Sequence, residues 1–134
     1  MAVIVLLATE WEPSKGGVSA FNQELAAALA RIGHKVECVV PRAVRREIDA
    51  AASLGVRLHS ALDVGVEPGV PFDLGEPIDV VVAHGRWTGR DGLRWRDRFQ
   101  ASRLVHVIHV HPAQIDGLVD ELSEPRLSEA LRAE

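Results

Sequence analysis

The chain has 134 residues, of which 47% are hydrophobic and 25% charged, and its net charge is −4 at neutral pH. This composition is typical of one globular domain; it excludes a disordered chain and gives no general attraction to nucleic acid. No apolar run approaches the roughly 20 residues that cross a bilayer, and the single cysteine cannot form an internal disulfide, so we expect a cytoplasmic protein without a membrane span.

The first forty residues follow the pattern of a strand, a turn, a helix and a second strand. Residues 3–8 are an uninterrupted apolar run, as in strands buried on both faces. A turn with a glycine pair follows at residues 9–17. Apolar residues then recur at steps of three and four, which predicts a helix that ends at Gly33 in a left-handed cap. With a strand at residues 36–40, this order predicts a right-handed βαβ unit.

Helices and strands continue to alternate along the rest of the chain. We expect helices at residues 42–54 and 88–102, strands at 56–59, 78–83 and 104–111, a surface excursion at 60–77, and helical pieces at 114–134, broken near Pro125. The alternation predicts an α/β fold, namely a Rossmann-like three-layer domain with a parallel sheet of about five to six strands. We place this domain at residues 1–113 and assign residues 114–134 to its terminal helical segment.

The glycine pair, Gly16 and Gly17, lies where an open parallel sheet binds its ligands, beyond the carboxyl end of a strand. Glycines let the backbone approach a ligand closely, and the following helix N-terminus, together with Lys15, suits a diphosphate or another anion. The turn matches neither G-x-G-x-x-G nor G-x-x-x-x-G-K-[ST], which disfavours NAD enzymes and P-loop kinases. The alternative interpretation is that the two glycines only make a tight turn.

The sequence from this turn onward resembles the family 4 glycosyltransferases, a retaining group with the GT-B fold that includes sucrose, glycogen and mannosyl transferases. The resemblance rests on S-K-G-G-V-S-A-F-N-Q-E-L-A at residues 14–26, A-L-A at 28–30 and G-H-K-V at 33–36, and it extends to about Pro112. It implies the N-terminal, acceptor-side half of an enzyme that transfers a sugar from a nucleoside diphosphate sugar to an acceptor. It also implies that Gly16, Gly17 and Lys15 bind the donor phosphates.

Histidines stand at the ends of two expected strands. The resemblance implies that His109 contacts the donor sugar as the catalytic residue and that His84, at the end of D-V-V-V-A-H, binds the acceptor. His111 is the alternative to His109 and a further acceptor-binding candidate. Each histidine could instead satisfy backbone groups at a strand end. His109 and His111 share one face of an extended strand, as metal ligands do, but no third ligand has a suitable spacing, so we expect no metal and no cofactor.

Two other side chains are candidates for acceptor binding. Arg86, expected in the loop after the strand at 78–83, carries a guanidinium that suits a carboxylate or a phosphate. Trp11 offers a ring for stacking on a sugar, or it only covers the sheet edge, whereas Trp95 is expected to pack in the core. Charged residues on one face of the helix at 88–102 are expected to form a solvated surface: Arg90, Asp91, Arg94, Asp97 and Arg98.

The resemblance also implies a missing part. In GT-B enzymes a second Rossmann domain supplies the glutamates that hold the donor, so we expect a C-terminal Rossmann domain or a partner chain, and an isolated chain that transfers no sugar. Apolar residues of the terminal segment suit a partner domain, folding back on this domain, or a homo-oligomer: Leu118, Val119, Leu122, Leu127 and Leu131. The alternative function is a non-catalytic Rossmann-like module that binds a partner protein or a small anion.

Overall fold

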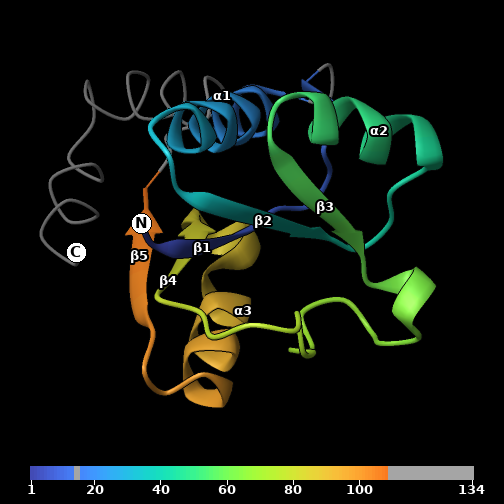
Figure 1. Ribbon diagram of the computed structural model, residues 1–134. Coiled ribbons are helices and arrows are strands. Elements are labelled where there is room, and N and C mark those ends of the chain that lie inside the picture. Colours follow the sequence, from blue (N-terminus) through green and yellow to red (C-terminus); the bar gives the residue numbers. More distant parts are fainter. Residues whose placement is uncertain (14–15, 109–134) are drawn as a thin grey trace, which may run out of the picture.

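The computed structural model describes residues 1–13 and 16–108, with only the backbone at residues 86 and 87 (Figure 1). Within this part of the chain, five strands pair in parallel in the order β3-β2-β1-β4-β5. The strands are β1 (Val3–Leu7), β2 (Lys35–Val40), β3 (Val56–Ser60), β4 (Val80–His84) and β5 (Arg103–Val107). The prediction of a Rossmann-like parallel sheet of about five to six strands is thus confirmed.

Helices cover both faces of this sheet and give the molecule three layers. Two of them, α1 (Gly17–Arg31) and α2 (Arg45–Ser53), lie on one face, and α3 (Gly85–Arg98) lies on the other (Figure 1). α1 ends as the sequence predicts: Gly33 has a φ of 99°, and the N–H of His34 donates to the carbonyl of Leu29 at 3.1 Å. This pairing is a Schellman cap, which glycine favours because it has no Cβ.

The central position of β1 in the sheet explains the uninterrupted apolar run at the start of the chain. Its residues alternate between two buried clusters: Ile4 and Leu6 pack beneath α1 and α2, whereas Val5 and Leu7 pack on the side of α3. Both faces are therefore withdrawn from water, and no polar residue is needed on either. Trp95 of α3 belongs to the second cluster with 1% of its surface exposed, which confirms its predicted packing role.

The connection between β3 and β4, residues 61–79, is only partly the surface excursion that the sequence predicts. Its first part contains a 3₁₀ turn, η2 (Leu62–Val64), and is exposed, with Leu62 at 61%. Its second part alternates between exposed and buried residues, and the buried Leu74 and Ile78 join the apolar cluster on the side of α3. The connection therefore covers a part of that sheet face, which explains why the segment retains large apolar residues among its prolines and glycines.

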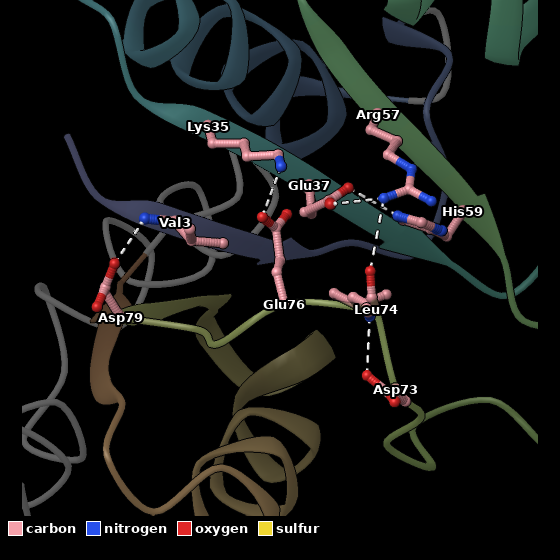
Figure 2. A network of polar contacts seen from close by, with 10 residues as sticks. Val3, Lys35, Glu37, Arg57, His59, Asp73, Leu74, Glu76 and Asp79 are labelled. Atoms are coloured by element: carbon pink, nitrogen blue, oxygen red, sulfur yellow. Dashed lines mark hydrogen bonds and ion pairs between the residues drawn. The ribbon is translucent and has the colours of Figure 1, made fainter.

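A polar network holds this connection against the sheet (Figure 2). Glu37 of β2 is completely buried and accepts hydrogen bonds from His59 Nε2 at 2.8 Å and Arg57 Nη1 at 3.3 Å. Arg57 Nη1 also lies 3.5 Å from the carbonyl oxygen of Leu74, and Lys35 Nζ lies 2.6 Å from Glu76 Oε2. The network thus links two strands to the backbone and side chains of the connection.

The helix after β4 begins earlier than the sequence predicts. We expected a loop around Arg86 and a helix from residue 88, but α3 begins at Gly85, directly after β4. Gly85 has a φ of 50°, which an L side chain rarely adopts, so glycine makes this abrupt start possible. β5 spans Arg103–Val107, and residues 109–111 of the strand expected at 104–111 lie outside the described residues. No helix within the described residues is both long and apolar enough to cross a membrane.

Candidate functional site

The order of the strands places a topological switch point between β1 and β4. From β1 the chain proceeds through α1 to β2 and β3 on one side, whereas β4 and β5 extend the sheet on the other side through α3. β1 and β4 are paired directly, with Leu6 opposite Val82. Because the chain leaves β1 and β4 toward opposite faces, their carboxyl ends open a crevice, where such sheets bind ligands.

The glycine turn leads into α1 at this same edge. Gly16 is the N-cap residue of α1, with φ 146° and ψ 177°, and its carbonyl accepts the first helical bond from Ala20 N–H at 3.1 Å. Gly16 and Gly17 are exposed, and no side chain of residues 1–13 or 16–108 caps the helix. Among the described residues, a Cβ added at either glycine would meet no heavy atom within 4 Å, so these residues leave open space in front of the turn. Uncapped N–H groups beside open space form a favourable anion site.

Glu10 adds a carboxylate to this region, which the sequence interpretation missed. It lies in the turn after β1 and accepts a hydrogen bond from the buried hydroxyl of Ser19 in the first turn of α1. Thr9 Oγ1 donates to the other carboxylate oxygen at 2.5 Å. Its position directly after a buried strand was the available signal. The negative charge is favourable beside a helix N-terminus, but it weakens the attraction of the turn for a second anion.

His84 lies at the carboxyl end of β4, as predicted, but its side chain is only 1% exposed. Its Nε2 donates to Asn22 Oδ1 at 2.8 Å, and its ring meets the ring of Phe21 edge-on with centroids 6.1 Å apart. Both partners belong to α1. Since the amide oxygen of Asn22 can only accept, Nε2 carries the proton. His84 therefore joins the end of β4 to the first half of α1.

The same network continues to the only cysteine of the chain. Asn22 is completely buried, and its Nδ2 donates to Cys38 Sγ of β2 at 3.6 Å. Burial raises the pKa of the Cys38 thiol to about 12, although the hydrogen bond from Asn22 acts in the opposite direction. The thiol is therefore neutral at physiological pH and is a poor nucleophile. Its contribution here is structural.

Thr88 joins the ends of the two strands at the switch point. Its hydroxyl donates to the carbonyl of Leu7 in β1 at 3.0 Å and accepts from the N–H of His84 in β4 at 2.7 Å. Thr88 is buried, with 3% of its surface exposed. No sequence pattern indicated this role, because Thr88 was expected only to begin a helix. The hydroxyl fixes the floor of the crevice where strand pairing ends.

His106 of β5 fixes the start of α3. Its Nε2 donates to the carbonyl of Gly85 at 2.7 Å. The ring lies so close to α3 that a Cβ at Gly89 would be 2.8 Å from Nε2. The sequence interpretation singled out His109 and His111 in this part of the chain and missed His106. Its position within an apolar strand was the available signal.

A small pocket of about 40 Å³ opens at the carboxyl ends of β1 and β2, on the side of α3. Asp91 of α3 lines it, together with Thr9 and apolar residues of the strands and of the connection. Asp91 is half-buried, so the prediction that it belongs to a solvated face is wrong. The prediction holds for the other members of that face, since Arg90, Arg94, Asp97 and Arg98 are all exposed.

The remaining candidate residues lie in the core, in α3 or outside the described residues. Trp11 is 1% exposed and belongs to the cluster beneath α1 and α2, so its ring has almost no surface open to a sugar. The backbone of Arg86 lies in the first turn of α3. Lys15, His109 and His111 lie outside the described residues. Within residues 1–13 and 16–108, no group of three or more histidines, cysteines or carboxylates could hold a metal ion.

The sequence matches a known protein family. A family model described as family 4 glycosyltransferase in conflict systems matches residues 5–134, which is nearly the whole chain. No curated protein and no solved structure matches significantly.

Proposed function

The chain belongs to the family 4 glycosyltransferases of conflict systems, and from this we propose that it is the acceptor-side domain of an enzyme that uses a nucleoside diphosphate sugar. One observation carries the proposal. The exposed N-terminus of α1 lies at the same edge of the sheet as the ends of β1 and β4, which the Thr88 hydroxyl joins by hydrogen bonds. The donor diphosphate and the acceptor would meet in the crevice at this edge.

In this proposal the glycine turn binds the diphosphate, which is the leaving group of the transfer. The N–H groups at the start of α1 would lie against its oxygens and stabilise the negative charge that develops there. Lys15, the residue before Gly16, would add a positive charge, whereas Glu10 limits how tightly a diphosphate alone is held. A site that favours developing charge over the bound ground state suits a leaving group.

His84 enters the proposal as a positioning residue. With its ring buried and bound to Asn22, it fixes α1, and therefore the glycine turn, relative to the end of β4. His109 remains the proposed contact to the donor sugar, with His111 as the alternative, and Arg86 the proposed contact to an anionic group of a substrate. The proposal makes no use of the ring of Trp11, because that ring lies in the core.

We further propose that a second Rossmann domain completes the site, either as a C-terminal domain or as a partner chain. Residues 1–13 and 16–108 form one Rossmann-like domain with one switch point. Sugar transfer requires donor and acceptor to be held together in a closed cleft from which water is excluded, and one open crevice does not provide this. The isolated chain is therefore expected to bind a diphosphate weakly and to transfer no sugar.

The glycine turn can be tested by titrating the chain with UDP, GDP, ADP and inorganic diphosphate and following the backbone amide signals by NMR. The signals of Gly16, Gly17 and Val18 should shift, and Gly17→Val should abolish the shifts. A Cβ at Gly17 meets nothing within 4 Å, so this variant is expected to fold and to block only the space where the ligand binds. Ala52→Val, at an exposed position near the far end of α2, is the matched control.

The enzymatic part can be tested with the chain combined with the domain or subunit that completes it. Release of nucleoside diphosphate from a panel of nucleoside diphosphate sugars should depend on an added acceptor and should be lost in Gly17→Val. If Gly17→Val binds diphosphate as well as the wild type, the glycine turn is not part of the diphosphate site. Robust sugar transfer by the isolated monomer would overturn the assignment as half of an enzyme.

A further inference from the structure

The pocket beside α3 is lined by the carboxylate of Asp91. Within the described part of the chain, Asp91 makes no hydrogen bond and no ion pair. Its carboxylate faces Gly69 of the β3–β4 connection so closely that a Cβ there would be 2.7 Å from Cγ of Asp91. Gly69 also has a φ of 84°. Only a glycine allows the connection to pass this close to Asp91, so the carboxylate is held in the wall of the pocket.

The other hydroxyl groups of the pocket are already engaged. Thr88 Oγ1 donates to the carbonyl of Leu7 and accepts from the N–H of His84, and Thr9 Oγ1 donates to Glu10. The rest of the wall is apolar and includes Val39, Val70 and Trp95. Asp91 is therefore the side chain of the described pocket that is available to a ligand. As a carboxylate, it accepts hydrogen bonds and opposes a second negative charge.

The size of the pocket limits what can enter it. About 40 Å³ is room for a few water molecules or for one small polar arm, but not for a sugar ring. Leu7 and Thr88, which are hydrogen-bonded at the switch point, also line the pocket. A group in the pocket would therefore lie beside the ends of β1 and β4. A ligand with its body in the crevice could thus place one arm against Asp91.

We propose that this pocket takes an uncharged, hydroxyl-bearing arm of a polyol acceptor, with Asp91 accepting a hydrogen bond from that hydroxyl. This inference rests on the proposed function, because it identifies the class of the acceptor for the same crevice. Asp91 acts as a specificity determinant: it favours a neutral CH₂OH group and disfavours a carboxylate or phosphate at this position. The apolar wall packs against the carbon atoms of the arm, and the arm displaces water from the carboxylate.

The experiment uses glycerol and glycerate as probes, because they differ only in replacing one CH₂OH group by a carboxylate. Each is titrated into the chain while the amide signals of Gly69, Val70 and Asp91 are followed by NMR. Glycerol should shift these signals and glycerate should not. In Asp91→Ala the affinity for glycerol should fall about tenfold, as for loss of a hydrogen bond to a charged group.

Asp91→Asn keeps the shape of the side chain and loses its charge, so it should remove the discrimination against glycerate. Asp97→Asn, on the exposed face of the same helix, is the matched control and should behave as the wild type. Equal binding of glycerol and glycerate by the wild type, or no shift at the pocket with either probe, would overturn the proposal. The diphosphate titration reports on residues 16–18, so failure of the proposed function and failure of this pocket give different signals.

Discussion

Replacing Glu37 by glutamine would test whether a buried carboxylate holds the β3–β4 connection on the sheet. Glu37 is completely buried and accepts hydrogen bonds from His59 and Arg57, and Arg57 also reaches the backbone of Leu74 (Figure 2). Glutamine has nearly the same shape, so the substitution removes the charge without opening a cavity. The expected loss of stability therefore comes from the polar contacts and not from packing.

The two contacts of Glu37 contribute unequally, because their partners differ in exposure. The side chain of His59 is 14% exposed, whereas that of Arg57 is 62% exposed and remains largely solvated. A buried hydrogen bond to a charged group contributes about 1.5–3 kcal/mol, and a solvated ion pair contributes about 0–1 kcal/mol. Glu37→Gln should therefore lower the free energy of unfolding by about 1.5–4 kcal/mol.

Urea denaturation followed by circular dichroism measures this change. The control is Asp49→Asn in the pair that Asp49 forms with Arg45, whose side chains are 62% and 85% exposed. That substitution should change the free energy of unfolding by less than about 0.5 kcal/mol. Hydrogen exchange at Leu74 should also become faster in Glu37→Gln. If Glu37→Gln is as stable as the control variant, the reasoning that the network anchors the connection is wrong.

Three further predictions concern other described residues. Thr88→Val should lower the free energy of unfolding by about 1–3 kcal/mol, because the buried N–H of His84 and the carbonyl of Leu7 lose their hydroxyl partner. Urea denaturation measures this change, and Ser53→Ala, at an exposed position, is the control. The hydrogen bond from Lys35 holds the pKa of Glu76 below its ordinary value of 4.5. Glu76 therefore stabilises the fold at a pH above its unfolded-state pKa, and this stabilisation is lost as the pH falls through the lower folded-state pKa. Lys35→Met should therefore weaken the loss of stability on acidification below about pH 5, and an unchanged pH dependence would contradict this. Because burial raises the pKa of Cys38 to about 12, iodoacetamide at about pH 8 should label it only after unfolding; rapid labelling of the folded chain, detected by mass spectrometry, would be the contrary result.

The sequence by itself determined most of the secondary structure, because local spacing controls it. Uninterrupted apolar runs marked β1 and β4, whose residues are buried on both faces. Helical periodicity and Gly33 marked α1 and its end, since a left-handed cap needs a residue without a Cβ. The glycine pair located the start of α1 beside the crevice. The family followed from this same stretch, since the motif at residues 14–36 lies within the matched region.

Only the tertiary structure decided which side chains act together. Thr88 bonds to a residue 81 positions earlier, and His84 bonds to Asn22 across 62 positions, so neither contact has a local pattern. Asp91 looks like part of a solvated helical face until the β3–β4 connection passes over it at Gly69. The physical reason is the same in each case. Periodicity records how a residue is oriented on its own element, whereas burial and pairing depend on which distant segment packs against that element.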